Sequence, residues 1–174
     1  MKRLEFVDFN VNDFKFKLEI KGDQSSLFVC IKCLLDQCVD ESKSDCLFSV
    51  MLNSSDNIAI LSDYYSDVLK GRNASDLSHK LEGSIYAVLC ILLHCALKQN
   101  LLDVETNVVV SSENDGIDEG RVKQFYEKLG FKYDHKVERM IGSAGDIFRV
   151  CMKQKDNISK EMLKIMSEVI GNFF

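Results

Sequence analysis

One apolar run, residues 85–97, constrains the fold of this chain more than any other segment. It reads IYAVLCILLHCAL, and the polar residues Lys98, Gln99 and Asn100 follow it. A helix that crosses a membrane needs about 20 consecutive apolar residues, so this run is too short to be one. It therefore predicts a helix buried on most sides inside a globular domain, and we expect no membrane association.

The overall composition agrees with a single globular domain. The chain has 174 residues, of which 46% are hydrophobic and 28% are charged. These values are ordinary for a protein that buries a sizeable core. The net charge of -5 gives no reason to expect nucleic acid as a partner, because binding phosphates requires a basic surface.

Seven cysteines and an N-terminus without an apolar signal segment favour a reducing compartment. We therefore expect a cytoplasmic protein with free thiols, and the nucleus is the other location left open. The spacing Cys30-x-x-Cys33, followed by Cys38 and Cys46, resembles half of a zinc site. Because no second close pair of cysteines or histidines accompanies it, buried structural thiols are the favoured interpretation, and no metal is expected.

Strands are predicted by two kinds of pattern. Apolar residues at every second position indicate strands near residues 3–9 and 13–21. Shorter apolar runs indicate strands over residues 47–52 and 58–65. The continuous β-branched stretch 107–111 is typical of a strand that is covered on both faces.

Helical spacing marks several other segments. Residues 27–38 combine a β-branched start with apolar residues at i, i+3 and i+4, and we favour a helix there. The buried helix is expected over residues 80–98. Residues 118–129 carry the apolar stripe of an amphipathic helix, which Gly130 stops.

The last part of the chain is expected to contain a hairpin and a terminal helix. Residues 143–146, Ser-Ala-Gly-Asp, are typical of a tight turn, and they separate two expected strands, 137–142 and 147–153. An apolar stripe along residues 157–172 predicts a second amphipathic helix. We expect this helix to pack against its own domain, and a homodimer contact is the alternative.

Together these elements predict a mixed α/β (α+β) fold with a single, mixed, mostly antiparallel central sheet flanked by helices. Residues 1–153 are expected to form one domain. Residues 154–174 are expected to add the C-terminal amphipathic helix to it.

The helix before Gly130 carries the most specific motif of the chain. Its sequence FYEKLGF, residues 125–131, resembles the last motif of the GNAT superfamily of acyl-CoA-dependent N-acetyltransferases. In that family a central strand leads into a loop that grips the pyrophosphate of acetyl-CoA, then a helix, a strand, the helix with this motif and a final strand pair. The resemblance covers roughly residues 46–153 and implies a GNAT-like fold with acetyl-CoA as cosubstrate.

The resemblance also implies where the cofactor would bind. The pyrophosphate loop of the family reads Arg/Gln-x-x-Gly-x-Gly/Ala, and this chain has Lys80-Leu-Glu-Gly-Ser-Ile85 at the corresponding place. Backbone N–H groups at a helix N-terminus bind phosphate directly, and a glycine allows a close approach. A plain N-cap of a core helix is the competing interpretation. The expected cofactor-binding residues are Tyr64, Tyr65, Arg72, Lys80, Gly83 and Ser84.

An acid and a base complete the implied site. Tyr126 matches the tyrosine that protonates the departing CoA thiolate in the family, and plain packing of its ring is the alternative. Asp63, on the central strand, is the candidate base that would deprotonate the amine, with Asp67 and Glu113 as other nearby carboxylates. Many family members carry an asparagine one or two turns before the tyrosine, where this chain has Glu119.

The expected function is therefore transfer of an acetyl group from acetyl-CoA to a primary amine of a small molecule or a protein. A second interpretation is a GNAT-like module that has lost efficient catalysis and acts as a binding or regulatory protein. Ile85 favours this second interpretation, because the family has a small residue there. A third is an unrelated α/β interaction protein in which residues 125–131 match by chance.

Overall fold

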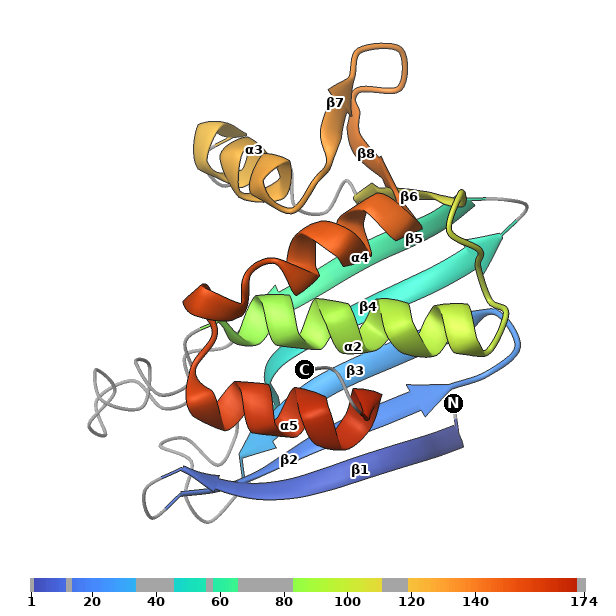
Figure 1. Cartoon of the computed structure of the whole chain (residues 1–174). Coiled ribbons are helices and arrows are strands. Elements are labelled where there is room, and N and C mark those ends of the chain that lie inside the picture. The colour runs from blue at the N-terminus through green and yellow to red at the C-terminus, as the bar shows by residue number, and fades with distance from the viewer. Residues whose placement is uncertain are drawn as a thin grey trace.

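The computed structural model describes residues 2–11, 14–33, 46–55, 58–65, 83–110 and 119–171, which contain eight strands in one sheet (Figure 1). The strand order across the sheet is β1-β2-β3-β4-β5-β6-β8-β7. Neighbouring strands are antiparallel except β5 and β6, which are parallel. The expectation of a single, mostly antiparallel sheet accompanied by helices is confirmed.

The first five strands form an antiparallel meander in which each strand pairs with the next. The alternation in β2 explains why this segment forms a strand. Phe16, Leu18 and Ile20 are buried under the helices, whereas Lys15 is exposed. The strands expected near 3–9, 13–21, 47–52 and 58–65 are confirmed as β1 Lys2–Val11, β2 Phe14–Gly22, β4 Cys46–Ser55 and β5 Ile58–Tyr65, and a further strand, β3 Ser26–Cys33, lies between β2 and β4.

The predicted central helix is α2 (Ser84–Lys98), and the strand that follows it is β6 (Asn107–Val110). Every residue over 87–93 is buried, as the apolar run indicates. Strand β6 lies parallel to β5, so β5, α2 and β6 form a crossover unit of the kind that joins parallel strands. Among the described residues, no helix is long and apolar enough to cross a membrane.

The helix α3 (Glu119–Lys128) leads into a hairpin made of β7 (Lys132–Asp134) and β8 (Arg139–Ser143). Gly130, with φ 95°, ends the helix as expected, because a positive φ suits glycine. Strand β8 lies between β6 and β7, so the later strand is inserted into the sheet and the earlier one forms the edge.

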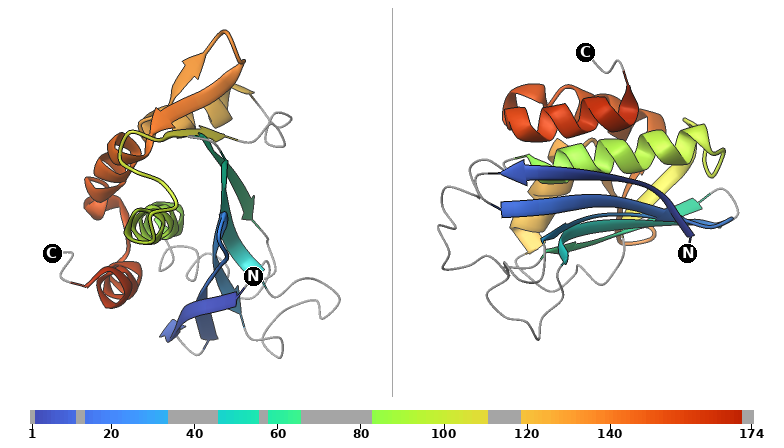
Figure 2. Two further views of the ribbon diagram at one scale, coloured as in Figure 1. Left: turned by 90° about the vertical axis from the view of Figure 1, so that its right-hand side faces the viewer. Right: turned by 90° about the horizontal axis from the view of Figure 1, so that it is seen from below.

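Three helices form a layer over one face of the sheet. Helix α4 (Ala144–Met152) and helix α5 (Lys160–Ile170) lie on either side of α2 and contact it, as Figures 1 and 2 show. A short 3-10 turn, η3 (Lys155–Asn157), joins α4 to α5. The apolar stripe of α5 is buried against its own domain through Met162, Ile165 and Met166.

The helix expected over residues 27–38 is wrong for residues 26–33, which form the central strand β3. Leu27, Val29 and Ile31 are buried on the helix-covered face. Cys30 is also buried, although it lies on the opposite face of the strand. Burial on both faces produces a nearly continuous apolar run, which resembles a helical pattern. Residues 34–38 lie outside the described part of the chain.

The strand expected over 137–142 corresponds to β8, but the strand expected over 147–153 and the hairpin between them are wrong, because residues 144–152 form helix α4. The side-chain oxygen of Ser143 accepts a hydrogen bond from the Asp146 backbone N–H at 3.3 Å and caps this helix. Ala144, Ile147 and Cys151 are buried at helical spacing. The hairpin that does exist is one element earlier, between β7 and β8.

Candidate functional site

The crossover unit places two parallel strands, β5 and β6, side by side. Within the described residues, their ladder runs from Ile58 paired with Asn107 to Leu61 paired with Val110. Strand β5 continues to Tyr65, whereas residues 111–118 lie outside the described part of the chain. In open sheets with parallel strands, ligands bind beyond the carboxyl ends of such strands, at a point where the order of the strands changes.

Three of the predicted site residues lie on this continuation of β5. In the backbone register, Asp63 pairs with Val50 of β4, Tyr64 with Ser49 and Tyr65 with Phe48. These three residues are therefore held on their β4 side by a regular antiparallel ladder. Two other predicted residues, Arg72 and Lys80, lie outside the described residues, as do Asp67 and Glu113.

Gly83 and Ser84 begin helix α2. Gly83 is the N-cap, with φ 79° and ψ 9°, and no side chain caps the helix at this position. Its carbonyl oxygen accepts the first helical hydrogen bond, from the Ala87 N–H at 3.0 Å. The left-handed conformation alone requires a residue such as glycine here. This explains why the helix starts at Ser84.

The space beside Gly83 is filled by the chain itself. A Cβ atom at this position would stand 2.5 Å from the Asn157 carbonyl oxygen and 2.6 Å from the Ile158 Cα. Real Cβ atoms essentially never come this close to other atoms. The glycine was expected to permit close approach of a pyrophosphate. In the structure, what approaches it closely is the backbone of residues 157–158.

Tyr126 lies near the end of α3 and is buried, with 3% of its surface exposed. Its ring makes an edge-to-face contact with Phe131, with centroids 5.4 Å apart. The Tyr126 carbonyl oxygen accepts hydrogen bonds from the N–H groups of Leu129 and Phe131. Packing therefore explains the positions of the Tyr126 and Phe131 rings, and the role of the Tyr126 hydroxyl as an acid stays a prediction.

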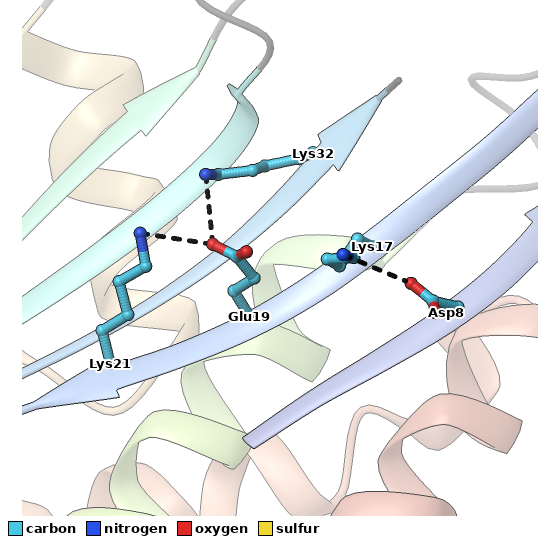
Figure 3. Close-up of polar contacts among 5 residues, drawn as sticks. All are labelled: Asp8, Lys17, Glu19, Lys21 and Lys32. Carbon is cyan, nitrogen blue, oxygen red and sulfur yellow. Dashed lines mark ion pairs between the residues drawn. The ribbon is translucent and has the colours of Figure 1, made fainter. Parts of the chain in front are cut away.

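A charged cluster that was not predicted lies on the sheet face turned away from the helix layer (Figure 3). Glu19 of β2 is only 8% exposed, and its Oε2 atom lies 3.1 Å from Lys32 Nζ and 3.3 Å from Lys21 Nζ. Nearby, Lys17 Nζ lies 3.9 Å from Asp8 Oδ1. Cross-strand neighbours of this kind interact directly in a sheet.

The two lysines decide the charge state of Glu19. Burial alone would raise the pKa of its carboxyl group, but the contacts with Lys32 and Lys21 outweigh burial, and the pKa is lowered. Glu19 is thus a carboxylate at neutral pH and a poor proton acceptor. The alternating charges of β2 indicate its polar face, but Lys32 could not be identified as a partner while residues 27–38 were expected to be helical.

The buried thiols have a structural role. Cys90 of α2 and Cys151 of α4 are both fully buried, where the two helices pack together. Contact with the Cys90 thiol, together with burial, raises the pKa of Cys151, which makes it unreactive as a nucleophile. Among the residues that the structure describes, no three His, Cys, Asp or Glu side chains are grouped as they would be to hold a metal ion.

Neither a scan against protein-family models nor a search of the curated proteins finds a match to this chain. The described residues define the class by their fold: a mixed α/β domain with a single, mostly antiparallel sheet, in which β5 and β6 are parallel and the buried helix α2 lies between them in the sequence.

Proposed function

We propose that this protein is an acyl-CoA-dependent N-acyltransferase that transfers an acetyl group from acetyl-CoA to a primary amine. One observation carries the proposal. The parallel strands β5 and β6 follow one another through the buried helix α2, so their carboxyl ends lie at the same edge of the sheet. Acetyl-CoA would bind at the carboxyl ends of these two strands.

The order of the elements supports this proposal. Strand β5, helix α2, strand β6, helix α3 and the pair β7–β8 follow one another along the chain, which is the order that GNAT enzymes have. The final strand pair follows α3 directly, with only residues 129–131 between them. The corrected hairpin thus fits the family order better than the one expected from sequence.

The cofactor would use backbone groups more than side chains. The pantetheine arm of acetyl-CoA contains two amide groups, which would pair with the backbone of Asp63, Tyr64 and Tyr65 as an added strand does. The pyrophosphate would lie at the N-terminal end of α2, near Gly83 and Ser84, where helix N–H groups and the helix dipole attract anions.

The chemical step would need one base and one acid. Asp63 would accept a proton from the ammonium group of the acceptor, directly or through water. The free amine would attack the thioester carbonyl, the nitrogen would release its second proton to solvent, the C–S bond would break, and Tyr126 would donate a proton or a hydrogen bond to the departing thiolate. A phenol has a pKa of ~10 and a thiol ~8.5, so stabilisation of the thiolate by the hydrogen bond is the larger contribution.

A module that binds without catalysis is the second candidate, and one observation favours it. The backbone of residues 157–158 fills the space beside Gly83, which narrows the approach to the proposed pyrophosphate site.

Incubation with acetyl-CoA and a panel of primary amines separates the two candidates. Acetylated product is best detected by mass spectrometry, because the seven cysteines of the chain would themselves react with a thiol reagent. Acetylation that depends on the protein supports the enzyme. Binding of acetyl-CoA with no product from any amine supports the module.

A further inference from the structure

The turn that joins α4 to α5 packs against Gly83, the residue at the N-terminal end of α2. The Asn157 carbonyl oxygen, the Ile158 Cα and the Ile158 Cγ1 would lie 2.5, 2.6 and 2.9 Å from a Cβ atom at residue 83. The N-terminal end of a helix carries partial positive charge, and a carbonyl oxygen carries partial negative charge. The Asn157 carbonyl oxygen therefore brings to this helix end a negative partial charge, the same sign of charge that a phosphate oxygen would bring.

Among residues 153–159, only Ile158 is buried. The backbone hydrogen bonds of the turn are local, since the N–H groups of Asn157 and Ile158 donate to Gln154 and Lys155 at 2.9 and 3.2 Å. Asn157 is exposed, whereas Ile158 is buried with 6% of its surface exposed. Short 3-10 turns are common connectors between helices. The side chain of Ile158 is thus the anchor of the turn on the domain.

We propose that this turn, residues 153–159, gates the N-terminal end of α2, so that acyl-CoA binds only when Asn157 and Ile158 move away from Gly83. The inference rests on the proposed function, because it concerns the same pyrophosphate site. A ligand that requires the open state binds with its intrinsic affinity multiplied by the open fraction. Any change that weakens the closed contact therefore strengthens the apparent binding of acyl-CoA.

Substitution of the anchor tests the gate. Ile158→Ala removes most of the buried side chain, and we expect the full-length variant to bind acetyl-CoA at least fivefold more tightly than the wild type. Ile165→Ala is the matched control, because Ile165 is similarly buried in α5 at 2% exposure and belongs to the stripe that packs on the domain. It should lose stability without a change in affinity for acetyl-CoA.

Hydrogen exchange provides a second readout that does not depend on a variant. With saturating acetyl-CoA, the amides of Asn157 and Ile158 should exchange at least fivefold faster, because a turn this short does not keep its hydrogen bonds once it leaves the domain. The amide of Gly171, which donates to Ser167 at the other end of α5, should be unchanged.

The outcomes separate the gate from the proposed function. Tighter binding by Ile158→Ala, together with faster exchange in the wild type, supports both. Equal binding by the wild type, Ile158→Ala and Ile165→Ala, or slower exchange at residues 157–158 in the presence of acetyl-CoA, overturns the gate and leaves the proposed function standing. Absence of acetyl-CoA binding in all three proteins overturns both.

Discussion

Lys32 Nζ of β3 lies 3.1 Å from Glu19 Oε2 of β2, on the sheet face opposite the layer formed by α2, α4 and α5. The register places Glu19 opposite Cys30 and Lys32 opposite Lys17, so the pair runs diagonally between two strands. A one-residue slip of β3 would move Lys32 to the other face and leave the carboxylate without this partner. The pair therefore favours the observed register of β2 with β3.

Removal of this charge should destabilise the protein. Glu19→Gln leaves the ammonium groups of Lys21 and Lys32 without a carboxylate, and we expect a loss of about 1–3 kcal/mol in the free energy of unfolding. Urea denaturation measures it. Asp8→Asn is the control, because Asp8 is 66% exposed and 3.9 Å from Lys17, and its loss should stay within about 0.5 kcal/mol. Equal losses of unfolding free energy in the two variants would show that the buried Glu19 contributes no more to stability than the exposed Asp8.

The same carboxylate predicts a pH dependence. The pKa of Glu19 is lower in the folded protein than its ordinary value of 4.5, so its contribution is present above that value and is lost as the pH falls through the folded pKa. Between about pH 6 and about pH 3, the wild type should lose more stability than Glu19→Gln does. If urea titrations show that the two proteins lose the same stability between these pH values, a lowered pKa of Glu19 is contradicted.

Gly83→Ala should be costly for two reasons that can be separated. A left-handed backbone costs a non-glycine residue about 1–2 kcal/mol, and the contact with Asn157 and Ile158 adds about 1–3 kcal/mol of overpacking. Gly171→Ala is the control, because Gly171 has the same φ of 79° with nothing within 4 Å of its Cβ position. Its ψ of -141° suits alanine no better. A loss at residue 83 no greater than at residue 171 would show that the contact adds nothing.

Tyr126→Phe tests the proposed acid. If the hydroxyl supports departure of the CoA thiolate, the rate of acetyl transfer should fall by about 10²–10⁴-fold, while acetyl-CoA still binds. Tyr133→Phe is the control, because Tyr133 lies on β7 and is 38% exposed. An unchanged rate for Tyr126→Phe would leave its ring as a packing residue against Phe131 and would remove it from the mechanism.

Much of the fold could be predicted in segments where each face of the strand or helix is consistently buried or consistently polar. In β2, alternation separates the buried Leu18 and Ile20 from the charged residues between them. In α2, the apolar run is buried almost completely. In β3 the pattern failed, because burial of Cys30 on one face and Val29 on the other produces an apolar run without alternation.

Two glycines show why the remainder could not be predicted. Gly145 was interpreted as part of a hairpin turn, but it lies within α4, where a Cβ atom would stand 3.0 Å from the Val104 carbonyl oxygen. Gly83 was interpreted as room for a pyrophosphate, and residues 157–158 occupy that room. In both cases a segment distant in the sequence packs against the glycine, and no local pattern indicates that contact.

The thermal stability of the protein with and without acetyl-CoA tests the central claim most directly. At a concentration of 100 times its dissociation constant, a ligand of the native state adds ~2.7 kcal/mol, which raises the melting temperature of a chain of this size by about 5–10 °C. We predict such a rise for the wild type, and the same rise at a lower acetyl-CoA concentration for Ile158→Ala. No rise in either protein at millimolar acetyl-CoA would contradict the assignment of an acyl-CoA site at β5 and α2.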